Sequence, residues 1–238
     1  MQGKFIAIEG PDGSGKELQS ELLVKRLFNE GYKVKYFDFP QYETSFFGKL
    51  AGKMLKGEYG PIENIDPHLA CLPLALDRMQ ASPEIKKTVR EGKIAIANRF
   101  TLSNVVHQGA RLPRDQRETY FKFIWDLENK ILEIPIPNLY IYLNVPREIS
   151  EKLILKKMQR KYLEGGKVDE LEKDGIHQTE ALGLYRELSN VLPNVARINC
   201  CNEEGELLTK EEIHEKVWIA TERSIFQEGQ SLNPERHS

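Results

Sequence analysis

The stretch 5–17 reads FIAIEGPDGSGKE, in which an apolar run leads into a glycine-rich turn and a lysine. The spacing of Gly10, Gly15 and Lys16 fits the phosphate-binding pattern G-x-x-x-x-G-K. Glycine reaches backbone angles that let successive amide N–H groups turn toward an anionic phosphate chain. A helix expected at about residues 16–30 adds the positive end of its dipole at the same place. The stretch therefore predicts a strand, a nucleotide-binding loop and a helix. The predicted nucleotide contacts are Gly10, Pro11, Asp12, Gly13, Ser14, Gly15, Lys16, Glu17 and Leu18.

One position departs from this pattern. A serine or threonine normally follows the lysine and binds Mg²⁺ through its hydroxyl, but here Glu17 follows, and Leu18 offers no ligand either. A carboxylate binds Mg²⁺ directly or through water, yet it also adds negative charge beside a triphosphate. Glu17 is therefore predicted as a weak metal ligand, and the sequence leaves open which of the two effects is larger.

Composition narrows the class of protein. The 238 residues are 40% hydrophobic and 29% charged, with a net charge of −2, which is typical of a soluble globular protein and not of a broadly basic nucleic-acid binder. We expect no signal peptide before the first strand, and no apolar run approaches the ~20 residues that span a bilayer. Cys71, Cys200 and Cys201 form no metal-binding pattern. A cytoplasmic protein without membrane or nucleic-acid partners is expected.

Apolar strand-like runs alternate with helical patterns along the chain, which predicts one α/β domain with a mainly parallel, five-stranded sheet flanked by helices. Strands are expected at 4–9, 33–38, 93–98, 138–144 and 195–200. Helices are expected at about 16–30, 45–57, 67–91, 114–133, 147–162, 175–190 and 209–221. Ligands of such sheets bind beyond the carboxyl ends of the strands, where the phosphate loop, Phe39-Pro40 and Asn98-Arg99 follow their strands. The domain is expected to cover 1–221, with a flexible tail at 222–238.

Several ordered motifs make the chain similar to the thymidylate kinase family of P-loop nucleoside monophosphate kinases. They are Glu9 to Lys16, Phe39-Pro40, Asp77-Arg78, Asn98 to Ser103, His107 to Gly109, and a charged, lid-like stretch at 156–174. The resemblance covers about 4–220. It implies a three-layer P-loop NTPase fold with a mobile lid and transfer of a phosphoryl group from ATP to dTMP with Mg²⁺. It also implies a homodimer that pairs through the helix at 45–57 or part of 67–91.

The resemblance further implies which residues carry the chemistry. Lys16 would hold the outer phosphates of ATP, and Arg99 would bind the phosphate of the acceptor. Asp12 would contact the acceptor sugar or phosphate region, although an aspartate that caps its own loop is an equal alternative. Arg160 in the lid would supply a transition-state cation, with Lys157 as the second choice. The catalytic residues are thus predicted to be Lys16, Arg99, Arg160 and Asp12.

The acceptor nucleotide has its own set of implied contacts. Arg78 would hydrogen-bond the base, or else form an ion pair on the helix surface with Asp77. Asn104 would read the pyrimidine edge, or else belong to a solvated polar face. The full predicted set is Phe39, Pro40, Leu74, Arg78, Arg99, Ser103, Asn104, His107 and Gln108.

Four further positions depart from the family pattern. Asn98 stands where the family usually has an acid, and Gln41 stands where it often has an arginine. Leu74 takes the place of an aromatic residue that stacks on thymine, and His107 takes the place of a tyrosine. Two other functions therefore stay open: a kinase for another pyrimidine monophosphate, or a catalytically weak nucleotide-binding relative. A generic ATPase or GTPase switch would need an aspartate at the end of a neighbouring strand, for which Asp38 is the nearest candidate.

Overall fold

A computed structural model describes residues 3–153 and 175–226, and in this part of the chain five parallel strands form one sheet. The strands are β1 (Lys4–Glu9), β2 (Val34–Asp38), β3 (Ile94–Asn98), β4 (Leu139–Asn144) and β5 (Val195–Asn199). Their order is β2-β3-β1-β4-β5. The predicted sheet is confirmed, and every strand pair in it is parallel.

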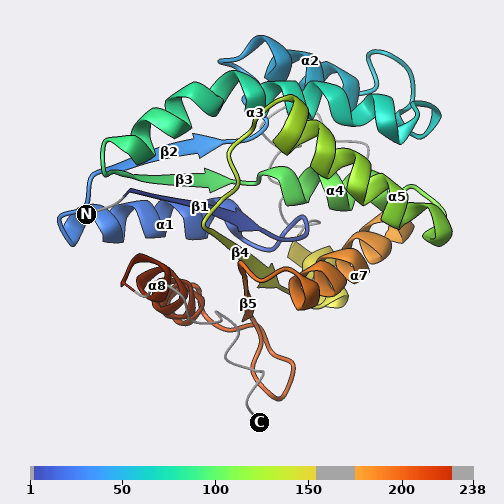
Figure 1. The fold of residues 1–238 in the computed structure, drawn as a ribbon. Helices are drawn as coiled ribbons and strands as arrows, with labels where there is room; N and C mark the ends of the chain where they lie inside the picture. Colours follow the sequence, from blue (N-terminus) through green and yellow to red (C-terminus); the bar gives the residue numbers. More distant parts are fainter. Residues whose placement is uncertain (1–2, 154–174, 227–238) are drawn as a thin grey trace.

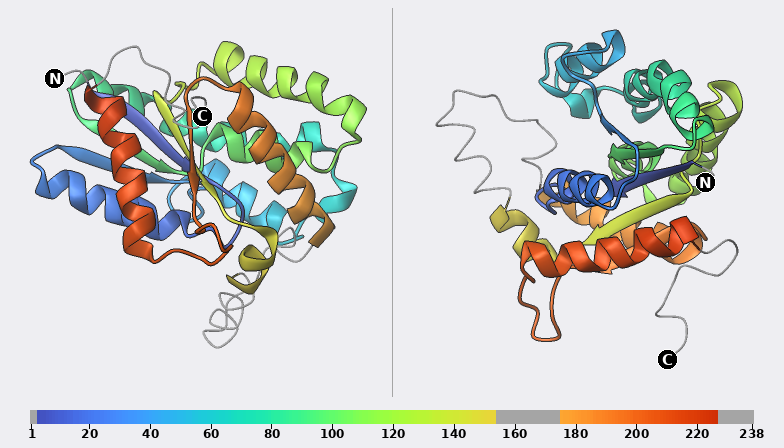
Figure 2. Two further views of the ribbon diagram at one scale, coloured as in Figure 1. Left: turned by 90° about the horizontal axis from the view of Figure 1, so that it is seen from below. Right: turned by 90° about the vertical axis from the view of Figure 1, so that its left-hand side faces the viewer.

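Helices cover both faces of this sheet, as Figures 1 and 2 show. Helices α1 (Lys16–Asn29) and α8 (Lys210–Phe226) lie on one face. On the other lie α3 (Pro67–Arg90), α4 (Thr101–Gly109), α5 (Arg114–Trp125) and α7 (Gly175–Val191), while α2 (Phe46–Leu55) packs outside α3. Two short elements, the 3₁₀ turn η1 (Ile62–Asn64) and the π-helical turn η2 (Asp126–Ile131), complete the described part. The three-layer arrangement is therefore confirmed.

Alternating strand residues build the two cores. In β1, Phe5 and Ala7 face the α3 side, whereas Ile6 and Ile8 face α1. A parallel strand that is covered on both faces needs apolar residues at its odd and its even positions, which explains the continuous apolar run at 5–8.

Two expected boundaries differ from the structure. The single helix expected at 114–133 changes to a π turn after Trp125. The tail expected from 222 was placed too early, because α8 continues to Phe226 and buries Ile225 in the core. Val217, Thr221 and Ile225 follow one another at four-residue steps, so they extend one buried stripe of the helix.

Of the helix expected at 147–162, residues 147–153 are helical. The lid-like stretch 156–174, with Lys157 and Arg160, and the residues from 227 onward lie outside the described residues. No helix in the described part is long and apolar enough to span a bilayer.

The topology brings three strand ends together at one edge of the sheet. Gly10 follows β1, and Arg99 donates its N–H to the carbonyl of Ile8 at 2.9 Å. Phe39 donates its N–H to the carbonyl of Asn98 at 3.1 Å. The phosphate loop, Phe39-Pro40 and Arg99 are thus neighbours, as parallel strands with this order require.

Candidate active site

The phosphate loop has the backbone that its glycines predict. Gly10, Gly13 and Gly15 have φ values of 153°, 77° and 82°. A Cβ on Gly10 would lie 2.8 Å from Ser14 Oγ and 3.0 Å from the carbonyl oxygen of Leu143, and the positive φ would strain any residue with a side chain. Lys16 begins α1 and donates from Nζ to the carbonyl of Pro11 at 2.6 Å, which places its ammonium across the loop.

Arg99 lies beside this loop in an unusual conformation. Its φ is 61°, in the left-handed region that residues other than glycine seldom adopt. The guanidinium forms an ion pair with Asp12 and lies 3.4 Å from Ser103 Oγ and 3.3 Å from His107 Nε2. A strained backbone that aims a charged side chain at a loop is typical of functional sites.

Asp12 is the centre of the contacts on this side. Burial opposes its ionisation, but the charges of Arg99 and Lys16 outweigh burial and lower its pKa. Gln178 Nε2 donates to its carboxylate at 3.1 Å, and Ser150 Oγ donates to its backbone carbonyl at 2.6 Å. The alternative that Asp12 only caps its own loop is wrong, because its side chain contacts Arg99, which follows β3, and Gln178 of α7.

His107 links Arg99 to helix α7. Its Nδ1 lies 3.3 Å from His177 Nε2, and the two rings stack with their centroids 5.6 Å apart. Burial lowers the pKa of His107 to about 3, and the charge of Arg99 acts in the same direction. The imidazole is therefore neutral at neutral pH. Asp12, Arg99, Ser103, His107 and Gln178 are called the phosphate-side cluster below.

Glu9 supports the same region from below and is a residue that the sequence did not assign a role. Its side chain is fully buried and accepts from the N–H groups of Phe100 (2.8 Å) and Ser103 (3.2 Å) at the start of α4. Ser103 Oγ (2.6 Å) and Tyr185 Oη (3.1 Å) complete its contacts. Burial raises the pKa of this carboxyl in spite of these hydrogen bonds. An acidic side chain here favours the helix start that follows Arg99.

Arg78 lies in a second, deeper cluster around Glu128. Arg78 donates to this carboxylate from Nε (2.9 Å) and Nη2 (2.5 Å). Thr101 Oγ1 and Asn104 Nδ2 also donate to it, at 2.7 and 2.9 Å. Burial alone would lower the pKa of Arg78, but the charge of Glu128 raises it. Arg78, Thr101, Asn104 and Glu128 are called the base-side cluster below.

Two alternatives for this region are wrong. Asp77 does not pair with Arg78, because its carboxylate accepts from the N–H and side-chain amide of Gln41 and from Ser45 Oγ. Asn104 is not on a solvated face, since only 2% of it is exposed.

The remaining predicted contacts lie around these clusters. Phe39 is buried with its ring 5.5 Å from that of Phe100, and Pro40 is half-buried. Leu74 packs against a small apolar cluster that includes Met54 and Ile62. Gln108 is fully buried and accepts from Arg111 at 2.5 Å, while its Nε2 has no partner.

Comparisons with known proteins agree with this arrangement. A family model described as thymidylate kinase matches residues 8–216. The chain belongs to the thymidylate kinase family. It is 31% identical to the thymidylate kinase of Caldicellulosiruptor saccharolyticus over 91% of this chain and 95% of that one. It is 30% identical to the Mycobacterium tuberculosis enzyme over 78% and 85% of the two chains.

The fold has a solved counterpart. The structure of thymidylate kinase from Candida albicans covers 97% of this chain and 96% of its own, with a TM-score of 0.67 and 21% identity. At that identity the likeness concerns the fold alone, and it agrees with the three layers described above.

Two regions that depart from the thymidylate kinase pattern concern the metal: the start of α1 and the end of β3. Glu17 and Leu18 are both exposed at the start of α1. Asn98 donates from Nδ2 to Asp38 at 2.8 Å, so the neutral amide at the end of β3 is joined to an acid at the end of β2. The Oδ1 atom of Asn98 is buried without a partner. The carboxylates of Glu17 and Asp38 and the amide oxygen of Asn98 are ligands of the type that Mg²⁺ prefers.

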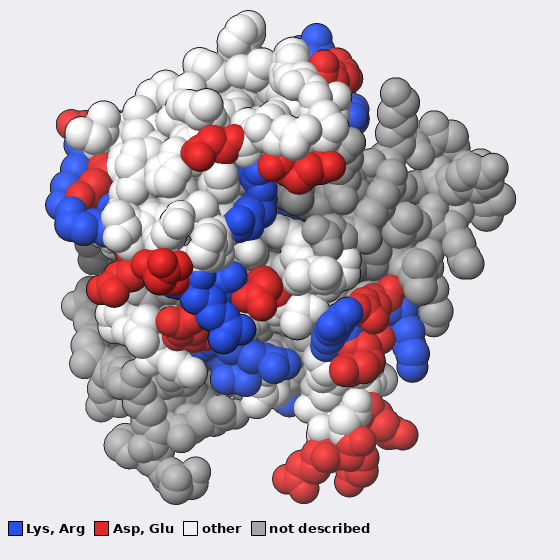
Figure 3. All heavy atoms as spheres, turned by 90° about the vertical axis from the view of Figure 1, so that its right-hand side faces the viewer, with Lys and Arg blue, Asp and Glu red and all other residues white. Residues whose placement is uncertain are grey.

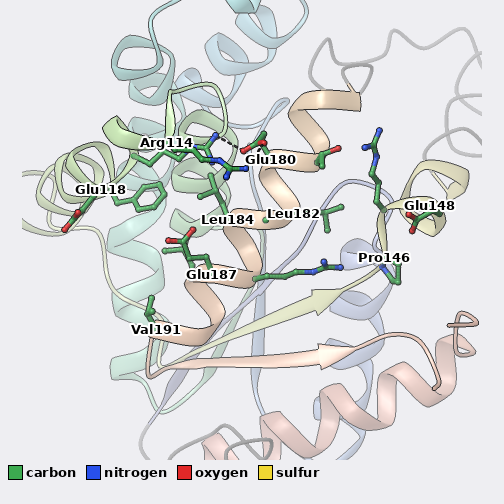
Figure 4. A pocket seen from close by; sticks show the side chains of 16 residues that line it. Arg114, Glu118, Pro146, Glu148, Glu180, Leu182, Leu184, Glu187 and Val191 are labelled. Carbon is green, nitrogen blue, oxygen red and sulfur yellow. Dashed lines mark ion pairs between the residues drawn. The ribbon is translucent and has the colours of Figure 1, made fainter. Parts of the chain in front are cut away.

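One pocket in the described part of the chain lies outside both clusters. This pocket of about 860 Å³ lies between α5, α7 and residues 146–148, where Arg117 pairs with Glu180 at 2.8 Å (Figure 4). No phosphate-loop or base-side residue lines it. Figure 3 shows basic and acidic side chains interspersed on the face toward which the strands point.

Proposed function

We propose that this chain transfers the γ-phosphoryl group of ATP to dTMP and releases dTDP and ADP. The observation that carries the proposal is the position of Arg99, which joins the phosphate loop to the first turn of α4. Arg99 contacts Ser103 in that turn, and the next residue, Asn104, donates to Glu128 in the base-side cluster. One helix therefore connects a donor-phosphate loop to a buried set of polar groups suited to a base, as a two-substrate kinase requires.

Binding and orientation account for most of the chemistry. The loop amides and Lys16 would hold the donor phosphates, and Arg99 would exchange Asp12 for the acceptor phosphate, which offers more oxygen atoms to the same guanidinium. Bringing two phosphates into contact requires cancellation of their charge, and cations positioned in advance supply it. Because the attacking group is already a phosphate oxygen, no general base is needed. Arg160 is proposed as the lid cation.

The residues near α1 fit a magnesium ion that is shared with the nucleotide. No group of three or more His, Cys, Asp or Glu side chains able to hold a metal occurs within residues 3–153 and 175–226. Mg²⁺ in kinases is usually held by one or two protein oxygens, by water and by substrate phosphates. Glu17, Asp38 and Asn98 would provide the protein oxygens, and the ion would neutralise charge on the phosphates.

Substitution at Glu17 tests this assignment. Glu17→Gln should weaken Mn²⁺ binding, measured by electron paramagnetic resonance with a non-hydrolysable ATP analogue, by roughly tenfold. Glu21→Gln, one helical turn further along α1, is the matched control and should leave the affinity unchanged. Glu17→Ser restores the hydroxyl of the usual pattern, and tighter Mn²⁺ binding by that variant than by the wild type would contradict a ligand role for Glu17.

A panel of acceptors tests the reaction itself. Purified protein with ATP and Mg²⁺ is given dTMP, dUMP, UMP, CMP or AMP, and ADP release is followed. Turnover should be fastest with dTMP. No turnover with any acceptor, combined with measurable ATP binding, would favour the catalytically weak relative. Faster turnover with UMP or CMP would favour another pyrimidine kinase, for which Leu74 in place of a stacking aromatic is the supporting observation.

We also propose a cytoplasmic homodimer. Phe46 on α2 and Leu69 on α3 are 70% and 61% exposed, and large apolar side chains exposed on two helices that pack together suit a protein interface. All three cysteines are free thiols, as expected in a reducing compartment. Light scattering with size-exclusion chromatography should give twice the chain mass, and Phe46→Asp with Leu69→Asp should shift it to the monomer.

A further inference from the structure

Glu128 is buried among side chains that the family resemblance assigns to the acceptor base. It lies in the π-helical turn η2, and none of its surface is exposed. Single π turns within helices are frequent at functional sites. Its two oxygens accept four hydrogen bonds, two from Arg78 and one each from Thr101 and Asn104. Both oxygens are therefore fully used by protein donors, which leaves none for a ligand.

This arrangement fixes the orientation of the Asn104 amide. Nδ2 of Asn104 donates to Glu128 at 2.9 Å and to the carbonyl of Cys71 at 3.2 Å. Both partners are acceptors only, so the NH₂ group has to face them. Oδ1 consequently points away, and it is buried without a partner. Asn104 thus offers an unused hydrogen-bond acceptor.

The same carboxylate fixes Arg78 as a donor. A guanidinium has five N–H groups, and Glu128 takes one from Nε and one from Nη2. Within the described part of the chain, Nη1 makes no hydrogen bond. The base-side cluster therefore offers an N–H donor from Arg78 and an oxygen acceptor from Asn104.

We infer that Glu128 is a positioning residue that makes the acceptor site selective for 4-oxo pyrimidines, such as thymine and uracil, over cytosine. This inference rests on the proposed function. A 4-oxo pyrimidine has an N3–H donor and an O4 acceptor, which complement Asn104 Oδ1 and Arg78 Nη1. Cytosine has an N3 acceptor and a 4-amino donor, so both of its groups meet groups of their own kind.

Glu128→Gln separates this role from packing, because the two side chains have nearly the same shape. Glutamine has one acceptor and one NH₂ donor, so it cannot accept from all four partners, and the orientation of the Asn104 amide is then less strictly fixed, with the Cys71 carbonyl as its remaining certain acceptor. The ratio of kcat/KM for dTMP to that for dCMP should fall roughly ten- to hundredfold. The KM for ATP should stay unchanged. Calorimetric Kd values for dTMP and dCMP should change in the same ratio without any turnover.

Two further variants complete the test. Asp126→Asn removes an exposed carboxylate from the same π turn, where it pairs with Lys122 and Lys130, and should leave the ratio unchanged. Asn104→Ala should lower the ratio as much as Glu128→Gln. The double variant should lower it little further, because both changes remove the same oriented acceptor, Asn104 Oδ1.

The outcomes discriminate between the explanations. Equal losses for dTMP and dCMP in Glu128→Gln would overturn the inference and leave Glu128 as a packing residue. If thermal unfolding shows that this variant does not fold, the ratio in Asn104→Ala decides, and an unchanged ratio there overturns the inference. Absence of turnover in the wild type would instead count against the proposed function.

Discussion

Two arginine–carboxylate pairs occupy the site, and they differ in burial. The Arg99 and Asp12 side chains are 22% and 9% exposed, whereas those of Arg78 and Glu128 are 4% and 0% exposed. The first pair joins two loop segments at the edge of the sheet. The second joins two helical elements inside the protein. An ion pair that has to yield to a substrate phosphate needs access to solvent, whereas one that selects a base works better when it is held fixed.

The backbone sharpens this contrast. Arg99 has a left-handed φ of 61°, and Arg78 lies within the regular helix α3. Two hydrogen bonds stabilise this strained conformation of Arg99. Its own N–H donates to the carbonyl of Ile8, and the N–H of Phe100 donates to Glu9. The phosphate-side cluster therefore depends on loop geometry, and the base-side cluster depends on helix packing.

The largest expected effect comes from breaking the deeper pair. Arg78→Met leaves Glu128 as a buried charge without its main partner, and such changes cost about 3–5 kcal/mol of unfolding free energy. Chemical denaturation of the wild type and variant measures this loss.

A double variant then tests whether the pair is needed for the fold. Arg78→Met with Glu128→Leu removes both charges, and it should recover most of the lost stability, because an apolar pair of similar size often replaces a buried ion pair. It should not recover dTMP binding. A double variant as unstable as the single one would mean that Glu128 holds Thr101 and Asn104 for stability and not for recognition.

Arg99 should show the opposite behaviour. Arg99→Ala should lower kcat/KM for the acceptor by roughly 10²–10³, the usual loss when one charge-stabilising donor is removed. Its unfolding free energy should fall by less than that of Arg78→Met, because Arg99 is part-exposed and Asp12 keeps the charge of Lys16 and the hydrogen bond from Gln178. Arg99→Lys keeps the charge without the paired N–H geometry and should recover part of the rate. A stability loss as large as that of Arg78→Met would remove the distinction between the two pairs.

The sequence predicts the phosphate-side cluster better than the base-side cluster, and the reason is chain distance. The glycines, Lys16 and the turn that they form are local, so spacing alone predicts them. Arg99 follows a strand, and the order of a parallel sheet places it near the loop. Gln178 reaches Asp12 from 166 residues away, and no local pattern predicts that contact.

Glu128 was missed although the sequence does hold a signal for it. Tyr120, Ile124 and Glu128 lie at four-residue steps and are 1%, 0% and 0% exposed, so a charged residue occupies an apolar stripe. A carboxylate in such a place needs buried donors. Which donors it finds depends on the packing of α3 and α4 against η2, and that packing is set by tertiary structure. The sequence likewise could not indicate that Asp77 turns to Gln41 and Ser45.

The smallest expected effect concerns His107 and the pH dependence of stability. The folded protein holds the pKa of His107 at about 3, whereas an unfolded chain has a value near 6.5. Between these values the unfolded state binds the extra proton, so unfolding free energy should fall as pH decreases from about 6.5 toward 3. The slope from one such group is at most about 1.4 kcal/mol per pH unit.

His107→Gln isolates this contribution, because glutamine does not titrate. Asp12, Arg99, Lys16, His177 and Tyr185 surround the ring, and Glu9 beneath it has a raised pKa whose effect on stability has the opposite sign. These groups remain in both proteins, so the difference between the two stability curves reports His107 alone to a first approximation. Denaturation at intervals from pH 4 to 7 should give curves that diverge as pH falls, with the variant less sensitive to acid. Parallel curves would mean that His107 keeps the same pKa in the folded and unfolded states, near 6.5. In that case the phosphate-side cluster would gain a positive charge beside Arg99 only below about that pH.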